Sequence, residues 1–153
     1  MPRYDVTSPY SEGASSDKKL YPCKKGRVCE ATLISAYGSG IDWTGDLDHD
    51  PLYLEPDNQG PDNKGVAIFW NLPANYMFCR EAGDGVFFKD QPRDDQFDEM
   101  NPAGNPTGPN NKCFDRFHWR AKNTLRDQSY QYKVIFRDSV RVYVIDPWIV
   151  NGK

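Results

Sequence analysis

The residues best suited to chemistry in this sequence are a cysteine and a histidine five positions apart. Cys113 and His118 lie in one alternating segment, and a nucleophilic thiol needs a base within hydrogen-bond reach. Residues five apart on an extended strand point to opposite faces, so the two side chains are not expected to touch. Blue copper needs two histidines, a cysteine and a weak axial ligand, but the only other histidine is His49 and no methionine follows Met100. We therefore predict that the protein is not an enzyme and carries no cofactor, with a hydrolase ranked last.

An acidic segment, predicted as a loop over residues 38–50, offers the next candidate site. Asp46, Asp48 and Asp50 alternate within it, and Ca²⁺ prefers six to eight oxygen ligands. The EF-hand pattern fails because Pro51 stands where that pattern needs glycine. These three aspartates are weak metal candidates, and a solvated acidic loop is the preferred interpretation.

Charge is unevenly distributed along the chain. Residues 41–64 hold seven acidic residues and one lysine, a net charge of -6, whereas residues 112–141 hold eight Lys or Arg and three Asp, a net charge of +5. If the strands of the second segment adjoin, their outward side chains form one basic face that could dock an acidic partner. A net charge of -3 disfavours nucleic acid as that partner. The predicted basic face consists of Arg116, His118, Arg120, Lys122, Lys133, Arg137 and Arg141.

These side chains depend on strands, and the longest strand-patterned region runs from Ser129 to Asn151. Aromatic and β-branched residues alternate with polar ones on both sides of a polar break at 137–139, which predicts a hairpin. Pro147 removes a backbone donor, so the second strand should end or bend there. Residues 91–112 are rich in Pro and Asn and are predicted to be irregular. Further strands are predicted at 27–35, 52–54, 66–72, 76–79, 85–89 and 114–122.

The order of the segments VAIFWNLP, YMF, GVFFK, FHWRAKN, YQYKV and IDPWIVN resembles small bacterial β-sandwich domains of uncharacterised function. Their plan is similar to cupredoxin-like and immunoglobulin-like sandwiches. The resemblance covers roughly the C-terminal two thirds of the chain and implies a fold but no activity. We predict an all-β protein, a two-sheet antiparallel sandwich of about seven to eight strands with long loops. The sandwich spans residues 23–153 and follows an extended N-terminal arm, residues 1–22.

The four cysteines are compatible with two disulfides, Cys23–Cys29 and Cys79–Cys113, or with free buried thiols. No signal peptide is visible after Met1, which favours the cytoplasm and reduced thiols and leaves a periplasmic or extracellular location open. No apolar run reaches the length of a membrane span. Peripheral attachment to a membrane complex stays open.

These patterns predict a non-enzymatic protein-interaction or accessory subunit of a larger assembly. Docking is expected through the N-terminal arm, the loop at 91–112 or the basic face. The alternative is a ligand-binding module for carbohydrate or metal, which would use the acidic loop and Trp43, Trp70 and Trp119. Exposure of the tryptophans separates the two, because a stacking platform needs exposed rings.

Overall fold

The computed structural model describes residues 21–24, 26–60, 62–89 and 96–152, so residues 1–20 of the predicted arm lie outside the described residues. The described chain is all-β, with eleven strands and two short 3₁₀ turns, η1 (Arg80–Ala82) and η2 (Pro109–Asn111). None of the described residues forms a helix long and apolar enough to cross a membrane.

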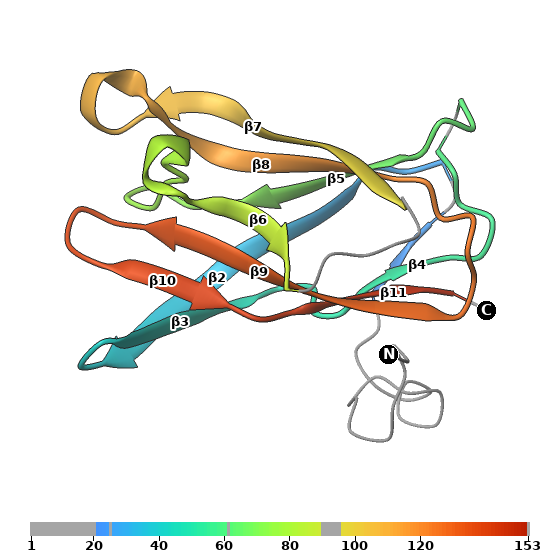
Figure 1. The fold of residues 1–153 in the computed structure, drawn as a ribbon, viewed down its shortest axis with the longest axis horizontal. Helices are drawn as coiled ribbons and strands as arrows, with labels where there is room; N and C mark the ends of the chain where they lie inside the picture. Colours follow the sequence, from blue (N-terminus) through green and yellow to red (C-terminus); the bar gives the residue numbers. More distant parts are fainter. Residues whose placement is uncertain (1–20, 25, 61, 90–95, 153) are drawn as a thin grey trace.

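The strands form two sheets (Figure 1). The first sheet has the order β1 (Tyr21–Cys23), β4 (Leu52–Leu54), β11 (Trp148–Asn151), β9 (Gln128–Arg137), β10 (Val142–Ile145), with β6 (Gly85–Phe88) also paired to β9. The second sheet has the order β3 (Asp42–Leu47), β2 (Cys29–Ser39), β5 (Val66–Asn71), β8 (Cys113–Ala121), β7 (Phe97–Thr107). Both sheets are mixed, because β1–β4, β4–β11 and β2–β5 are parallel pairs. The prediction of purely antiparallel sheets was therefore wrong.

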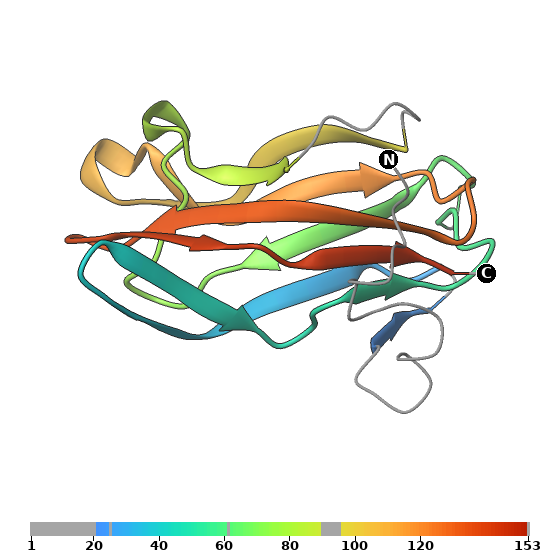
Figure 2. The same ribbon diagram turned by 60° about the horizontal axis from the view of Figure 1, so that its bottom comes forward.

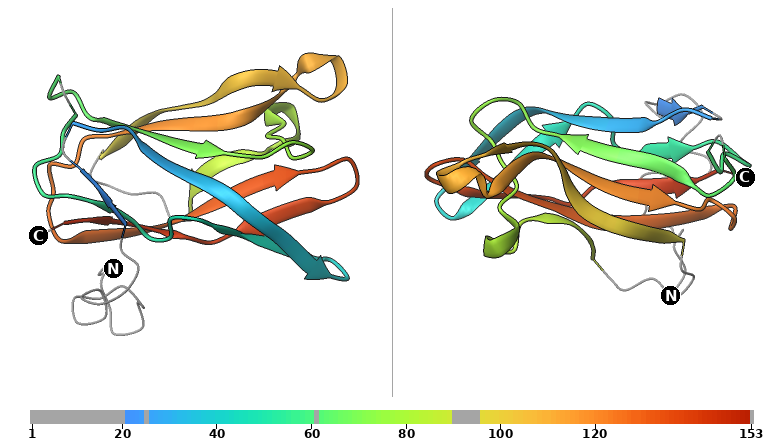
Figure 3. Two further views of the ribbon diagram at one scale, coloured as in Figure 1. Left: turned by 180° about the vertical axis from the view of Figure 1, so that it is seen from behind. Right: turned by 90° about the horizontal axis from the view of Figure 1, so that it is seen from above.

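The two sheets share one hydrophobic core, which lies between the layers seen in Figures 2 and 3. Trp70 of β5 donates its indole N–H to the Tyr132 hydroxyl of β9 over 3.0 Å, which joins the sheets through a buried polar contact. Trp119 of β8 packs its ring 4.9 Å from that of Trp70. The alternation predicted for β8 and β9 is confirmed, since Phe117 and Trp119 are buried while Arg116 and His118 face outward.

Strand β9 holds the first sheet together. Its first half pairs with β11 and its second half with β10, so one long strand is matched by two short ones. The interruption falls at Asp146–Pro147, where the Pro147 carbonyl still accepts the Tyr132 N–H over 3.0 Å. The predicted hairpin and the predicted break at Pro147 are both confirmed.

Two segments that were predicted to be irregular are strands. The acidic segment 38–50 forms the turn and second strand of the β2–β3 hairpin. Strand β7 occupies half of the Pro/Asn-rich segment 91–112 and is an edge strand with two register shifts. Edge strands tolerate proline such as Pro102 and Pro106, because one row of N–H groups needs no partner strand. The shifts also break the two-residue alternation, which hid the strand from pattern analysis.

All four cysteines form disulfides, Cys23–Cys29 and Cys79–Cys113, so the preference for free thiols was wrong. The first disulfide joins β1 of the first sheet to β2 of the second. The second joins the start of β8 to the segment that follows Phe78, a residue that bridges to Phe114. The disulfides do not support the predicted cytoplasmic location, because disulfides are rare in the cytosol.

Candidate interaction surface

The β2–β3 hairpin turns through two residues, Gly40 and Ile41, between the paired residues Ser39 and Asp42. Gly40 has φ +61°, a left-handed conformation that glycine adopts without a steric penalty. Between Leu33 and Ser35 the register shifts. A bulge of this kind bends the strand and re-aims the side chains beyond it.

Apolar side chains project from this hairpin into solvent. Ile41 is 94% exposed, Ile34 is 65% exposed and Tyr37 is 49% exposed. Two exposed carboxylates, Asp42 and Asp46, accompany them. We call these five residues the hairpin surface. Ile34 lies at the register shift and Ile41 in the turn, so apolar exposure extends along the hairpin. Large exposed apolar side chains accompanied by polar groups are typical of protein-binding sites.

Asp46 fixes the β2 side of the hairpin surface. Its carboxylate accepts a hydrogen bond from the Ser35 hydroxyl over 3.1 Å and from the Tyr37 hydroxyl over 3.0 Å. The hydrogen bond to Asp46, followed by the charge of Asp46, raises the pKa of Tyr37. Tyr37 therefore stays protonated at neutral pH and holds its ring along the strand.

Trp43 of β3 contacts both the turn of its own hairpin and the neighbouring strand β10. Its indole N–H donates to the Gly40 carbonyl over 2.8 Å, and its ring meets the edge of Tyr143 at 6.0 Å. The Arg141 guanidinium lies 4.1 Å from the Trp43 ring centroid. Cation–π stacking of this kind places Arg141 on Trp43.

The aspartates proposed as weak metal candidates do not converge. Asp48 accepts the Thr32 N–H over 2.7 Å, while Asp50 accepts the Trp148 N–H of the other sheet over 3.1 Å. Burial raises the pKa of Asp50 to about 6. The described residues contain no group of three or more His, Cys, Asp or Glu placed to hold a metal ion.

The predicted basic face is divided between the two sheets. Arg116, His118 and Arg120 lie on β8 of the second sheet, followed directly by Lys122, whereas Lys133 and Arg137 lie on β9 of the first. Arg141 follows the β9–β10 turn. Since β8 and β9 do not adjoin, the condition for one basic stripe is not met; docking through any one of these residues stays a prediction.

Two of the predicted basic residues, Arg116 and Arg137, are engaged within the fold. Arg116 donates to Asn71 over 2.6 Å and to Glu30 over 3.2 Å, and it stacks on Phe69. Arg137 forms a two-pronged ion pair with Asp84, at 2.6 and 2.8 Å. These contacts neutralise charge that looked available in the sequence.

Two further members of the set are occupied on β8. Arg120 pairs with Glu99 at 3.4 Å and donates to the Gly65 carbonyl at 2.9 Å. Burial lowers the pKa of His118, whose ring packs on Phe69 at 4.9 Å between centroids. The imidazole is therefore neutral at pH 7 and adds no positive charge to the face.

The tryptophans do not form an exposed platform. Trp70 and Trp119 are core residues, 1% and 0% exposed, and Trp43 and Trp148 are half-buried. A carbohydrate site built on Trp70 and Trp119 is therefore contradicted by their burial.

Sequence reasoning missed Ile34, Tyr37 and Ile41 as candidate binding residues. It ended the first strand at Ser35 because the glycines and aspartates that follow are typical of loops. The Ser39-Gly40 dipeptide next to Ile41 was the available signal for a hairpin turn.

No protein-family model matches the chain, and no curated protein matches it.

Proposed function

We propose that this two-sheet fold is a β-sandwich that serves as a non-enzymatic interaction module, an accessory subunit that docks onto a larger assembly through its hairpin surface. The observation that carries the proposal is the exposure of Ile34 and Ile41 beside two carboxylates that have no described cationic partner. Burying two isoleucine side chains contributes about 1.5–3 kcal/mol each. That gain is realised only when a partner covers them.

Charge complementarity indicates the chemistry of the partner. Asp42 and Asp46 flank the apolar side chains, so the matching surface carries an apolar recess rimmed by Lys or Arg. Many of the chain's cations are already paired, among them Arg116, Arg120 and Arg137. A separate, basic protein is therefore a better fit than another copy of this chain.

The two disulfides support an oxidising compartment as the place of action, because disulfides persist in the periplasm or outside the cell and are rare in the cytosol. In such a compartment they would brace the sheets while the hairpin surface stays accessible.

The test is the native mass of the protein in extract from its own cells, compared with that of the Ile34→Ser/Ile41→Ser variant. We expect the wild type to elute well above its monomer mass of 17.5 kDa and the variant to elute as a monomer. Both positions are exposed, so stability should change by less than about 0.5 kcal/mol.

The matched control is Val142→Ser/Val144→Ser, which removes two exposed β-branched residues, 45% and 37% exposed, from β10. This control should leave the assembly intact. A wild type that elutes as a monomer, or an assembly lost equally in both variants, would contradict docking through the hairpin surface.

A further inference from the structure

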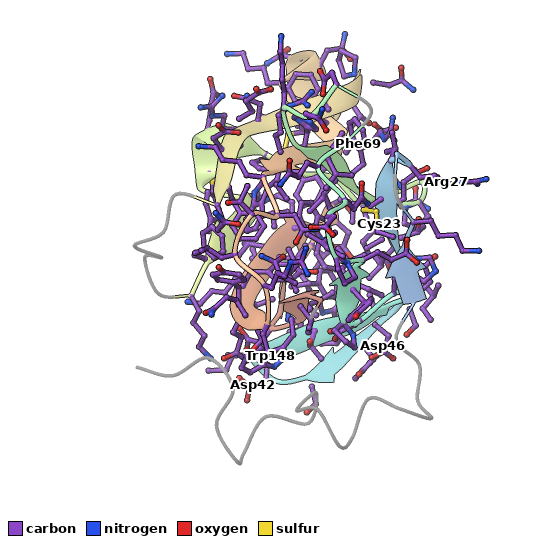
Figure 4. The ribbon with its side chains drawn as sticks, turned by 90° about the vertical axis from the view of Figure 1, so that its right-hand side faces the viewer. Cys23, Arg27, Asp42, Asp46, Phe69 and Trp148 are labelled. Atoms are coloured by element: carbon purple, nitrogen blue, oxygen red, sulfur yellow. A yellow bond between two sulfur atoms is a disulfide. The ribbon has the colours of Figure 1, made fainter. Side chains whose placement is uncertain are left out.

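A second feature, independent of the hairpin surface, lies where β1 meets β2. An open pocket of about 300 Å³ is lined by the Cys23–Cys29 disulfide and Leu52 and by Lys24, Arg27 and His49. Cys23, Cys29 and Leu52 are 7%, 3% and 1% exposed and form a buried apolar base. Figure 4 shows Arg27 reaching into solvent beside the disulfide of Cys23.

Several described residues beside the cationic side chains are fixed by a disulfide and by hydrogen bonds to Asn58. The disulfide joins two cysteines at a sequence separation of six residues. Asn58, which is 0% exposed, donates its side-chain amide to the carbonyls of Cys23 and Lys24 over 2.9 and 3.1 Å. The same side chain accepts the Gly26 N–H over 3.0 Å. Asn58 therefore holds the backbone groups of Cys23, Lys24 and Gly26 in place before any ligand arrives, which lowers the entropic penalty of binding.

The two cationic side chains of this pocket, Lys24 and Arg27, form no ion pair within the part of the chain that the structure describes. Glu30 is the acidic residue of the lining, and its carboxylate is bound by Asn71 at 2.9 Å and Arg116 at 3.2 Å. Its negative charge is thus neutralised from the side of β5 and β8.

His49 lines one side of the pocket, and a hydrogen bond fixes the orientation of its ring. Its Nδ1 lies 2.8 Å from the Glu30 carbonyl oxygen, so Nδ1 carries the proton and donates it. The same atom lies 3.9 Å from the Asp48 carboxylate. The ring is therefore oriented by the backbone of β2 and does not depend on a ligand for its position.

We infer that this pocket binds a small oxyanion, a carboxylate or phosphate group, through Lys24 and Arg27. A guanidinium presents two parallel donors that match two oxygens of such a group, and the lysine ammonium adds a point charge. The apolar base of disulfide and Leu52 suits a ligand whose anionic group is attached to a small apolar body.

The experiment is a two-dimensional amide NMR titration of the full chain with sodium phosphate and, separately, with sodium acetate. Both are compared with sodium chloride at matched ionic strength. We expect saturable shifts of the Lys24, Gly26 and Arg27 amides that chloride does not produce. Saturation by phosphate alone would assign the site to a phosphate group, and saturation by acetate alone would assign it to a carboxylate.

Variants separate this site from general surface charge. Arg27→Gln should weaken binding about tenfold, because it removes a charge-assisted, two-pronged contact. Lys122→Gln, which removes an exposed cation beyond the end of β8, should leave the affinity unchanged. Cys23→Ser/Cys29→Ser keeps both cations and frees the loop, so it should weaken binding severalfold while the remaining spectrum stays folded. Shifts no larger than those with chloride, or equal losses in Arg27→Gln and Lys122→Gln, would overturn the proposal.

Discussion

The β2–β3 and β9–β10 hairpins both expose aliphatic side chains at the end of the molecule away from the C-terminus, but they treat their charges in opposite ways (Figure 1). In β9–β10, Asp138 accepts hydrogen bonds from the amides of Val140 and Arg141 and from the Tyr143 hydroxyl. Burial opposes ionisation of Asp138, yet these hydrogen bonds together hold its pKa below the usual value. The Asp138 carboxylate therefore finds its hydrogen-bond donors within its own hairpin.

In β2–β3, the carboxylates of the hairpin surface meet hydroxyl groups or solvent rather than cations. Asp46 is bound by Ser35 and Tyr37, and Asp42 forms no ion pair with a described residue. Asp138 has three hydrogen-bond donors and the positive charge of Arg141 within its own hairpin, whereas Asp42 has neither among the described residues. The β2–β3 hairpin is therefore suited to a cationic partner. Substitutions in the two regions show whether their charged groups contribute to the stability of the fold or to binding.

The largest loss of stability is expected when the Cys79–Cys113 disulfide is removed. Replacing Cys79 and Cys113 by serine should lower the free energy of unfolding by about 4 kcal/mol, because the closed loop is long. Replacing Cys23 and Cys29 should lower it by about 2 kcal/mol, since that loop is short. Urea unfolding of the two double variants measures both values. Equal losses, or no loss in either, would contradict the pairing.

The next largest loss of stability is expected when the ion pair between Asp84 and Arg137 of β9 is broken. Asp84 is 1% exposed and holds both Arg137 and the Cys79 N–H. Asp84→Ala leaves a partly buried guanidinium without its partner, which should lower the free energy of unfolding by about 3 kcal/mol. The matched control is Glu81→Ala, because Glu81 forms an exposed pair with Lys112 at 4.0 Å and should matter by less than about 0.5 kcal/mol. Similar losses in both variants would show that the Asp84–Arg137 pair is not special.

A smaller, pH-dependent effect separates the aspartates of the acidic segment. Burial raises the pKa of Asp50 to about 6 in the folded protein, from an ordinary value of 3.8. The folded state therefore favours the protonated form, and stability from this group falls as pH rises from about 4 to about 6.

Asp50→Asn keeps an acceptor for the Trp148 N–H and removes the buried charge. It should raise the free energy of unfolding at pH 7.5 by about 1–3 kcal/mol and flatten the profile between pH 4 and 6. Asp42→Asn, at an exposed carboxylate that does not contribute to the pKa shift of Asp50, is the control and should keep the wild-type slope. A slope that persists in Asp50→Asn would assign it to another group.

The smallest expected effect on stability lies on the hairpin surface itself. Asp42→Asn should change the free energy of unfolding by less than about 0.5 kcal/mol, since Asp42 is exposed beside the turn. It should nevertheless weaken the assembly roughly threefold and reduce its sensitivity to salt, because a charge at the rim of an interface is lost. An assembly with unchanged affinity and salt dependence would remove Asp42 from the interface.

Part of this picture was accessible from the sequence. The alternation of β8 and β9 identified Phe117, Trp119 and Tyr132 as inward-facing, because burial imposes a two-residue period on regular strands. Strand β7 and the β2–β3 hairpin were not predicted, because bulges and turn-forming residues interrupt that two-residue period.

The candidate site was not predictable in the same way. Segregation of acidic and basic residues along the chain suggested a basic face, but the fold brings opposite charges together, as in Arg126 with Asp57 and Arg116 with Glu30. Which charges stay unpaired depends on the order of strands in each sheet, which residue patterns do not encode. The hairpin surface became visible only when its exposure was known.

The most direct test of docking through the hairpin surface is amide hydrogen exchange of the chain in its native assembly, compared with the isolated monomer. Docking through the hairpin surface should add protection in residues 34–46 and leave residues 138–144 unchanged. Added protection confined to residues 138–144, with the β2–β3 hairpin exchanging as in the monomer, would contradict it.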